Sequence, residues 1–354
     1  MGPRSLARRS TAQDVAKLVG CSVSAVSLVV NGKSSGRVSN DTVGRIWKAV
    51  AELEYRLNTS ARSLATGQSG SLAFVCPDPT NPFFSLVMEG ITSALTDRYE
   101  LTLLVPSFAS DYGRATVHRA LAGDFAGLLL ASPGRWILDG FVPTCPTIVL
   151  DSGGEASGLA CIDLDVHSAG REVAEHLTSL GHRTVAYVGI SRDKASLQHR
   201  RTALATALAE HNAELVAYDL VLEELSIAIA EKALPGAWDR WSRQGVTAIV
   251  CGDELYAYGI MQAARALGLD VPRDVSIVGF NNLVYSTFVQ PSLTSVDMSA
   301  RVLGIEAGRA LQHYIDSGHP PASRLLKTLL VVRQSTGQAP TARSSSGPET
   351  ATPR

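Results

Sequence analysis

The sequence predicts an α/β protein in two parts: a small all-α headpiece, followed by a larger domain with two lobes of parallel β-sheet. Residues 11–55 contain three short helix patterns and no strand pattern. From residue 71 onward, apolar strand patterns alternate with helix patterns, which is typical of parallel sheets covered by helices on both faces. At 354 residues the chain is also too long for one ordinary hydrophobic core.

Helix signals open the headpiece. Thr11 is the expected N-cap of a helix over Ala12–Val19, and Gly20 ends that helix. Ser22 is the expected cap of a second helix over Val23–Val30. A helix, a turn containing glycine and a second short helix form the helix-turn-helix pattern of DNA-binding proteins.

A third helix is expected from near Ser39 to about Glu54, after a polar loop over residues 33–38. Its apolar residues recur at helical spacing and predict the face that packs in the core. They are Val43, Ile46, Trp47, Val50 and Leu53.

A short segment separates the headpiece from the larger domain. Asn58 is a possible N-cap for two helical turns ending at Ala65, and residues 66–70 have the composition of a linker. So short a helix is marginal in water and needs a partner to fold. We therefore expect a headpiece over residues 1–57, a hinge and linker over 58–70, a two-lobed domain over 71–337, and a disordered tail over 338–354.

The larger domain is predicted to contain at least seven strands and five helices. The expected strands are Ser71–Cys76, Leu101–Val105, Gly127–Ala131, Thr147–Asp151, Thr184–Gly189, Ala248–Gly252 and Ser276–Asn281. The expected helices are Phe83–Tyr99, Ala169–Leu180, Arg201–His211, Leu255–Leu267 and Arg301–Ser317. Two lobes of this kind place the polar loops at the carboxyl ends of their strands around a shared cleft.

Basic residues are concentrated near the beginning of the chain. Residues 1–70 contain ten Lys and Arg against four Asp and Glu, a net charge of +6, whereas the remainder carries −7. A basic headpiece on an acidic body indicates that the headpiece binds a polyanion. From charge alone, the alternative of a merely solvated surface remains open.

Several function classes are disfavoured by what the sequence lacks. Five scattered cysteines without a Cys-X-X-Cys pair indicate a reducing compartment. Neither a secretion signal nor a membrane-spanning apolar run is found, so we expect a cytoplasmic protein that does not bind membranes. The sequence has no nucleotide-binding, hydrolase or zinc-protease motif, and its histidines lack metal-ligand spacing. We expect no enzyme activity, cofactor or metal, and we expect His182 to bond the carbonyls of a helix end.

Ordered motifs along nearly the whole chain resemble the lac repressor (LacI/GalR) family. In the headpiece and hinge these are Thr11–Ala16, Gly20–Ser27, Val29–Gly32, Arg37–Ser39, Ala51–Tyr55 and Asn58–Gly67. In the larger domain they are Asn81–Phe84, His176–Arg183, Val271–Phe280, Pro291–Thr294 and Arg333–Thr336. The resemblance implies a two-lobed domain like that of periplasmic binding proteins, which binds a small-molecule effector and controls the DNA affinity of the headpiece.

The resemblance also implies which headpiece residues contact DNA. The second helix would lie in the major groove with Val23 and Ser24 toward the base edges. Phosphates would be bonded by Thr11, Ser22, Ser27 and Asn31, and Arg37 belongs to the same DNA-binding set. The alternative that Ser22 and Asn31 only cap helices remains open.

Leu28 departs from the family pattern. Many members have arginine here, which can make a bidentate contact to guanine worth roughly 1–3 kcal/mol of discrimination. Leucine cannot make this contact, so our hypothesis is that Leu28 packs on a thymine methyl group or on the protein. The operator should then differ from the family norm at that base pair.

Residues 58–65 resemble the hinge helix of the family, which folds on binding DNA. Leu64 would wedge into the minor groove at the operator centre, and Ala61 and Leu64 would pack against the second hinge of a dimer. Asn58 would begin this helix. Leu57 replaces the usual preceding proline, which leaves the hinge entry less preorganised. The alternative is a linker with one incidental leucine.

Five residues are implied as ligand contacts in the cleft. Phe83 and Phe84 would stack on a ligand, unless they are ordinary core aromatics. Arg200 occupies the place of the family's ligand-binding arginine, unless it is a surface charge on a helix. Relatives commonly have Asn-Asp where this chain has Asp253-Glu254, and Asp at Asn281. The acidic and amide groups are thus exchanged across the cleft, and we expect Asp253 and Asn281 to bracket a polyhydroxylated ligand.

Together these features predict a homodimeric transcriptional regulator, most simply a repressor, on a pseudo-palindromic DNA operator. The effector would be a sugar or a related polyol or nucleoside. One alternative is a ligand-independent DNA-binding regulator whose pocket has drifted. The other is a small-molecule binding protein without a DNA role, which the basic helix-turn-helix disfavours. The apolar heptads with which some relatives form tetramers are absent.

Overall fold

The computed structural model describes residues 10–340 except 31, 33, 56–69, 97, 107–124, 155, 157, 191–194, 217–219 and 223. The chain divides into two compact units, Met1–Ser69 and Gly70–Arg354, which we call the headpiece and the body. In the described ranges, no single helix has the length and apolarity to cross a membrane. The bent pair formed by the first two helices passes that test only when both are taken together.

The headpiece contains three helices, α1 (Ala12–Val19), α2 (Val23–Val30) and α3 (Asn40–Glu52). The first two have the predicted bounds, and α3 is slightly shorter than predicted. Their common core is made of buried apolar side chains, among them Val15, Val26 and Ile46. This arrangement confirms the predicted helix-turn-helix.

Helix α1 of the headpiece is capped at both ends by the residues that the sequence predicts. Thr11 and Asp14 form a capping box at the start of α1, and Gly20 ends α1 with a left-handed φ of 74°. The side chain of Arg45 on α3 donates to the carbonyl oxygen of Val19 at the end of α1. A cation at this end of a helix is favourable because the last carbonyls carry partial negative charge.

Trp47 corrects one prediction for the headpiece. It was expected on the buried face of α3, but its side chain is 48% exposed, whereas the neighbouring Ile46 is fully buried. Helical spacing alone placed both residues within the same wide apolar stripe. The three-helix core is narrow and covers only part of that stripe.

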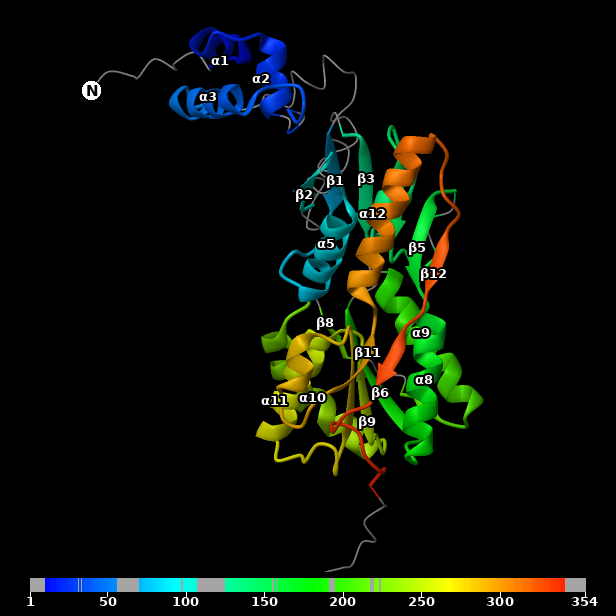
Figure 1. Cartoon of the computed structure of the whole chain (residues 1–354). Helices are drawn as coiled ribbons and strands as arrows, with labels where there is room; N and C mark the ends of the chain where they lie inside the picture. The colour runs from blue at the N-terminus through cyan, green and yellow to red at the C-terminus, as the bar shows by residue number, and fades with distance from the viewer. Residues whose placement is uncertain are drawn as a thin grey trace, which may run out of the picture. The chain divides into compact units, whose positions relative to one another are not determined.

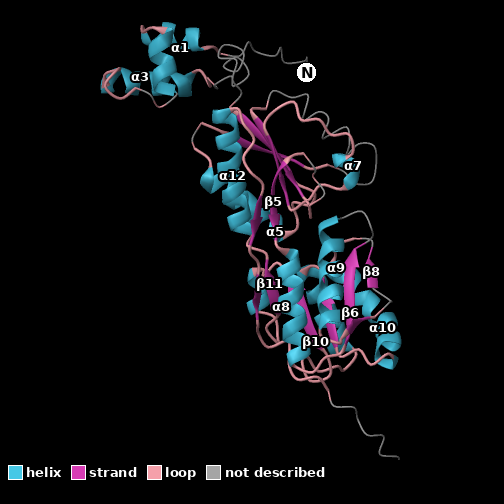
Figure 2. Cartoon of the chain, turned by 90° about the vertical axis from the view of Figure 1, so that its right-hand side faces the viewer, coloured by secondary structure: helices cyan, strands magenta, loops and turns pink. Residues whose placement is uncertain are grey.

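The first lobe of the body is a six-stranded parallel sheet in the order β12-β5-β4-β3-β1-β2. Helices α5 and α12 belong to this lobe (Figure 1), and Figure 2 shows α7 beside the same sheet. The strands are β1 (Ser71–Val75), β2 (Glu100–Leu104), β3 (Gly127–Ala131), β4 (Thr147–Leu150), β5 (Ala160–Leu164) and β12 (Arg324–Leu326). The helices are α5 (Pro82–Ala94), α7 (Arg135–Leu138) and α12 (Ala300–Ser317).

The second lobe has a seven-stranded sheet in the order β13-β11-β10-β9-β6-β7, with β8 also paired to β6. All pairs are parallel except β11 with β13. The strands are β6 (Thr184–Ile190), β7 (Glu214–Leu215), β8 (Leu220–Leu222), β9 (Ala248–Cys251), β10 (Ser276–Phe280), β11 (Thr294–Asp297) and β13 (Leu329–Val331). The helices are α8 (Val166–Ser179), α9 (Ala195–Glu210), α10 (Ile227–Arg243), α11 (Glu254–Ala266) and the short 3₁₀-helix η1 (Val284–Thr287).

The chain passes between the lobes three times: from β5 into α8, from β11 into α12, and from β12 into β13. Figure 2 shows the helices α8 and α9 on the second lobe and α12 on the first. The predicted two-lobed parallel α/β architecture is therefore confirmed. One predicted helix was too long, because Leu95 is extended and α5 ends at Ala94 rather than at Tyr99.

Two glycines allow helices α5 and α12 to pack with their backbones in contact. A Cβ atom on Gly90 would lie 2.2 Å from the carbonyl oxygen of Arg301, and one on Gly304 would lie 2.0 Å from that of Val87. No larger side chain fits without separating the helices. These two helices therefore form one rigid layer of the first lobe.

Candidate functional site

Helix α2 presents a polar, exposed side. Ser22, Val23, Ser24 and Ser27 are exposed, whereas Val26 on the opposite side is fully buried in the headpiece core. The hydroxyl oxygen of Ser22 accepts a hydrogen bond from the backbone N–H of Ala25 at 3.1 Å, so Ser22 does cap the helix. A cap of this kind leaves the rest of the first turn open to a groove of DNA.

The other predicted DNA contacts divide into two groups. Thr11 and Arg37 are exposed, and Leu28 is half-buried. The hydroxyl group of Thr11 donates to Asp14 at 2.7 Å. The remaining predicted contacts lie outside the described residues; they are Asn31, Asn58, Ala61 and Leu64.

A buried polar cluster lies where the strands of the two lobes end. Asp253 follows β9 and Asn281 follows β10 in the second lobe, and Asn81 begins α5 in the first lobe. One carboxylate oxygen of Asp253 accepts hydrogen bonds from the amides of Asn81, at 3.0 Å, and of Asn281, at 2.8 Å. All three side chains are at most 4% exposed. The cluster therefore joins the lobes at the carboxyl ends of their strands.

The positions of Asp253 and Asn281 correct one part of the prediction. The two residues follow neighbouring strands of one sheet, β9 and β10, rather than facing each other across the cleft. They bond each other directly, so the exchange of acid and amide keeps a donor opposite an acceptor. A ligand would meet them as one combined surface of the second lobe.

Arg200 on α9 belongs to the same cluster. It is 3% exposed, which rules out the alternative of a surface charge. Its Nη1 atom donates to the carbonyl oxygen of Gly252 at 2.8 Å and to Oδ1 of Asn281 at 3.4 Å, and the guanidinium lies over the Phe280 ring. The buried Nε atom has no hydrogen-bond partner among the described residues. A buried N–H group without an acceptor lowers the stability of the fold. Its presence indicates a site where a bound molecule supplies the missing acceptor.

The sequence did not identify Asp151 as a site residue, although a strand was predicted to end there. Asp151 is 4% exposed and accepts a hydrogen bond from the hydroxyl of Ser132 at 2.8 Å. Burial raises the pKa of its carboxyl group, and the positive charge of Arg200 opposes that shift. Asp151 and Asn281 both have positive φ angles, 49° and 112°, so two uncommon backbone conformations coincide at this site.

The two phenylalanines at the start of α5 are core residues. Phe83 and Phe84 are 3% and 9% exposed, belong to the main hydrophobic core, and pack edge to face with ring centroids 5.2 Å apart. This geometry supports the interpretation as core aromatics that was left open above. Contact with a ligand would require Phe84 to be uncovered.

Glu254, next to Asp253, forms hydrogen bonds to a different segment of the second lobe. It is fully buried, and its carboxylate accepts from the backbone N–H of Leu283 at 2.7 Å and from the hydroxyl of Ser286 at 2.5 Å. Burial raises the pKa of Glu254 to about 8, and these two hydrogen bonds oppose the shift. Glu254 thus links η1 to the start of α11, whereas the neighbouring Asp253 belongs to the polar cluster.

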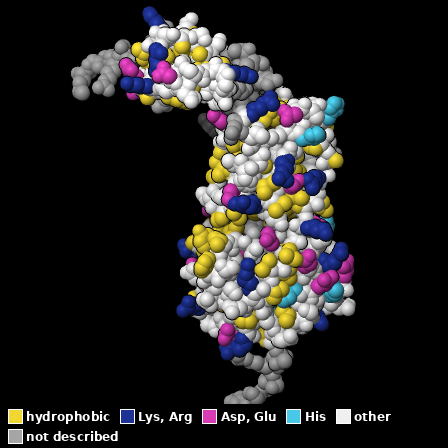
Figure 3. All heavy atoms as spheres, in the orientation of Figure 1, with side chains coloured by type: hydrophobic (Ala, Val, Ile, Leu, Met, Phe, Trp, Pro, Cys, Tyr) yellow, Lys and Arg dark blue, Asp and Glu magenta, His cyan; other side chains and the backbone are white. Residues whose placement is uncertain are grey.

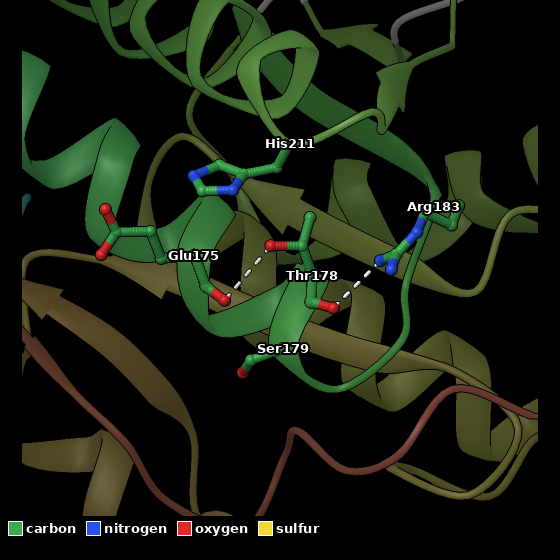
Figure 4. A pocket seen from close by; sticks show the side chains of 5 residues that line it. All are labelled: Glu175, Thr178, Ser179, Arg183 and His211. Carbon is green, nitrogen blue, oxygen red and sulfur yellow. Dashed lines mark hydrogen bonds between the residues drawn. The ribbon is translucent and has the colours of Figure 1, made fainter.

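A surface pocket of about 350 Å³ lies away from this cluster, near the amino end of β6. Figure 4 shows its lining: Glu175, Thr178, Ser179, Arg183 and His211. Arg183 turns back to donate to the carbonyl oxygen of Thr178 at 2.9 Å. One guanidinium nitrogen of Arg183 is thus engaged by the backbone at the end of α8.

The buried cluster offers a guanidinium, two carboxyl groups and two amides, which can bind hydroxyl or carbonyl groups of a ligand. Among the described residues, no group of three or more His, Cys, Asp or Glu is arranged to hold a metal ion. The geometry is suited to recognition of a polar small molecule.

Family models match two parts of the chain. Residues 11–58 match the model of bacterial regulatory proteins of the lacI family, and residues 174–336 match the periplasmic binding protein-like domain. The first match covers the three headpiece helices. The second covers the second lobe, with Arg200, Asp253 and Asn281, and continues through α12 to the final strands.

Two curated relatives are transcriptional regulators. The chain is 30% identical over 317 residues to the HTH-type transcriptional regulator GntR of Pseudomonas aeruginosa, covering 86% of this chain and 88% of the relative. It is 29% identical over 334 residues to the HTH-type transcriptional repressor PurR of Vibrio campbellii, covering 92% and 98%. These relatives regulate transcription and are not enzymes, in agreement with the sequence prediction.

Solved structures show the same architecture. A complex of the transcriptional regulator CelR with cellobiose has a TM-score of 0.66 at 26% identity, covering 92% of this chain and all of that one. The lac repressor dimer bound to operator and the anti-inducer ONPF has a TM-score of 0.76 at 24% identity, covering 93% and 100%, which is a likeness of fold. Given the 30% identity to GntR along most of both chains, this chain belongs to the lacI family and is a DNA-binding transcriptional regulator.

Proposed function

We propose that this regulator is a homodimeric repressor whose affinity for a pseudo-palindromic operator is controlled by a neutral polyhydroxylated effector bound between its lobes. The observation that carries the proposal is the buried cluster of Arg200, Asp253 and Asn281 at the carboxyl ends of the second-lobe strands. Its unpaired guanidinium N–H and its carboxylate match the donors and acceptors of a sugar hydroxyl. The relative CelR, which was solved with cellobiose, supports a sugar as the class of effector.

DNA recognition is assigned to the exposed side of α2. Val23 and Ser24 would face base edges, while Thr11, Ser22, Ser27, Asn31 and Arg37 would contact phosphates. In the hinge, Asn58 would begin a helix in which Ala61 and Leu64 pack against their counterparts, with Leu64 in the minor groove. The headpiece would thus extend to residue 57 and the hinge and linker to residue 70. Such a protein acts in the cytoplasm, where bacterial DNA is found.

A second copy of the chain is the proposed partner of η1. Three apolar side chains in and beside η1 are exposed: Val284 by 63%, Tyr285 by 57% and Phe288 by 75%. Glu254 fixes this segment through its hydrogen bonds to Leu283 and Ser286. Figure 3 shows hydrophobic side chains gathered in patches on the face of the body in view. The lac repressor with the same fold was solved as a dimer on its operator, and a two-fold operator requires a two-fold protein. Sedimentation of Phe288→Asp should show monomers at concentrations where the wild-type protein is dimeric.

The test combines DNA selection with effector binding. Duplexes selected in vitro by the full chain should converge on a palindrome, and fluorescence anisotropy should give its affinity at two salt concentrations. Isothermal calorimetry with cellobiose, ribose, other neutral sugars and nucleosides should identify a compound that binds the wild type and changes operator affinity. A palindrome whose affinity no compound alters would support the drifted-pocket alternative. Absence of any selected sequence would contradict the assignment of α2.

Leu28 provides a sharper test of the DNA contact. In the wild type, Leu28 would meet a thymine methyl group, and Leu28→Arg should move the selected base at that position toward guanine with roughly 1–3 kcal/mol of discrimination. Val30→Ala in the same helix, at a half-buried position, is the matched control and should leave base preference unchanged. An unchanged preference in Leu28→Arg would show that position 28 does not face the bases.

A further inference from the structure

Asn81 is the residue that joins the two lobes within the buried cluster. It comes from the first lobe, at the start of α5, and its amide nitrogen donates to Asp253 of the second lobe, 172 positions later in the chain. At 3% exposure for each partner, the hydrogen bond is shielded from water. A hydrogen bond to a buried carboxylate is among the stronger neutral–ionic contacts in a protein.

Both partners also cap a helix. Oδ1 of Asn81 accepts from the backbone N–H of Phe83 at 3.0 Å and caps α5, while Oδ1 of Asp253 accepts from that of Leu255 at 2.9 Å and caps α11. The hydrogen bond between them therefore links the amino ends of two helices from different lobes. The charge of Asp253 lies at the positive end of both helix dipoles, which favours this arrangement.

The link extends into the first lobe through helix packing. The close contact of α5 with α12 at Gly90 and Gly304 prevents α5 from moving alone. A displacement of Asp253 relative to Asn81 is therefore a displacement of the whole α5–α12 layer. Asp151 of the first lobe also interacts with two residues of α9 in the second lobe: with Ser196 by a side-chain hydrogen bond and with Arg200 by charge.

We propose that Asn81 is the coupling residue of this regulator: its hydrogen bond to Asp253 ties lobe closure to the group that receives the effector. This inference rests on the proposed function for the effector itself. An effector hydroxyl that bonds Asp253 competes with the amide of Asn81 for the same oxygen. The same carboxylate oxygen of Asp253 would then determine both whether the effector is bound and how the lobes are oriented.

Two substitutions separate coupling from helix capping. Asn81→Ser keeps a good N-cap for α5 but is too short to reach Asp253, and Asn81→Asp keeps the cap while placing a second carboxylate against Asp253. Thr80→Ala is the matched control, since it removes a 2.6 Å hydrogen bond to Asp78 in the same loop. The measurement is hydrogen exchange by mass spectrometry on the full chain, without effector and without DNA.

We expect exchange in the segment Gly252–Leu255 to accelerate roughly tenfold in Asn81→Ser and roughly a hundredfold in Asn81→Asp, with Thr80→Ala unchanged. Acceleration confined to the start of α5 would overturn the proposal, because it would leave Asn81 a helix cap only. So would wild-type exchange in both variants. Because this readout needs no ligand, its outcome is independent of whether the proposed sugar effector is correct.

A second readout concerns regulation. For the sugar that binds the wild type in the calorimetric panel, Asn81→Ser should bind it more tightly, since the competing amide is gone. The same variant should show a smaller ratio of operator affinities with and without that sugar. Unchanged sugar affinity and an unchanged ratio would overturn the coupling role, whereas a panel in which no compound binds the wild type would count against the proposed function instead.

Discussion

Strands β6, β9 and β10 of the second lobe carry a buried polar cluster at each of their two ends. At the amino ends, His182 is fully buried and both of its ring nitrogens are hydrogen-bonded. Nδ1 lies 2.8 Å from the hydroxyl of Thr247, and Nε2 lies 3.0 Å from that of Ser276 and 3.1 Å from the carbonyl oxygen of Gly337. This cluster fastens the segment after β13 to the sheet.

At the carboxyl ends of the same strands, the cluster of Arg200, Asp253 and Asn281 contains charged groups and one unpaired buried donor, Nε of Arg200. It also receives a side chain from the other lobe, Asn81. A cluster that is fully hydrogen-bonded within one lobe stabilises the fold, whereas one with unpaired capacity between lobes is available to a ligand. The difference between the two ends therefore separates a structural site from a recognition site.

The largest expected effect is on stability at the amino ends. His182→Ala removes a buried side chain and leaves Thr247, Ser276 and Gly337 without their partner, which should lower the free energy of unfolding by about 3–4 kcal/mol. Denaturant titration measures this loss. His313→Ala, at an exposed position on α12, should change the free energy of unfolding by less than about 0.5 kcal/mol. Operator and sugar affinity of folded His182→Ala should stay at wild-type values, and their loss would contradict the structural assignment.

The same histidine predicts a pH dependence of stability. Burial lowers the pKa of His182 from 6.5 to about 4 in the folded protein, because the charged ring would lose its hydration. The unfolded chain binds this proton more readily, so the contribution of His182 is complete above about pH 6.5 and is lost as the pH falls toward about 4. The loss amounts to at most about 3 kcal/mol. The difference in unfolding free energy between wild type and His182→Ala should therefore shrink between pH 7 and pH 4.5; a constant difference would contradict the shift.

Among the strands of the body, the sequence predicted best those that are buried on both faces. β3 was predicted with its observed bounds because all five of its residues are apolar and buried, as in a strand covered on both faces. β5 was missed because Asp163 interrupts its apolar pattern, and this carboxylate accepts from the backbone N–H of Ser152 at 2.6 Å. α10 was missed because Pro235 lies inside the helix. Both misses reflect polar or backbone-breaking residues tolerated by tertiary contacts.

The site was predictable residue by residue but not as a network. Arg200, Asp253 and Asn281 were identified from their motifs, while Asn81 was noted only as part of a motif because its partner is 172 positions away. Asp151 was visible only as the end of a strand. His182 was expected to bond helix carbonyls, but its ring bonds Thr247 and Ser276 instead. Long-range pairing of this kind is fixed by sheet order, which local patterns do not encode.

At the carboxyl ends the larger expected effect is on ligand binding. Arg200→Met keeps an apolar stem over Phe280 but removes the guanidinium, so affinity for the sugar bound by the wild type should fall about 100-fold or more. The free energy of unfolding should also fall, by about 1–3 kcal/mol, because the carbonyl oxygen of Gly252 loses its donor and buried Asp151 loses an opposing charge, while removal of the unpaired Nε offsets part of the loss. Arg200→Lys keeps the charge without the planar fork and should bind the sugar at an intermediate level. If Arg200→Met destabilised the fold as much as His182→Ala, the contrast between the two ends would fail.

The smallest expected effect distinguishes contact between the lobes from strain within one of them. Gly153 and Gly154 follow Asp151 in the first lobe and have similar left-handed φ angles, 65° and 84°. A Cβ atom on Gly153 would lie 2.0 Å from Nδ1 of His199 on α9, whereas one on Gly154 would meet nothing within 4 Å. Both alanine variants incur the backbone cost of roughly 1–2 kcal/mol, but only Gly153→Ala pushes against the second lobe.

We therefore expect Gly153→Ala to lower the free energy of unfolding by about 1 kcal/mol more than Gly154→Ala, and to accelerate hydrogen exchange in the segment Gly252–Leu255. Adding His199→Ala to Gly153→Ala should remove this excess, because the clashing ring is gone. Equal unfolding free energies and equal exchange rates in the two glycine variants would mean that the lobes can move apart at this contact without a loss of stability. In that case the hydrogen bond between Asn81 and Asp253, rather than the contact of Gly153 with His199, would carry the cost of moving the lobes apart at this cluster.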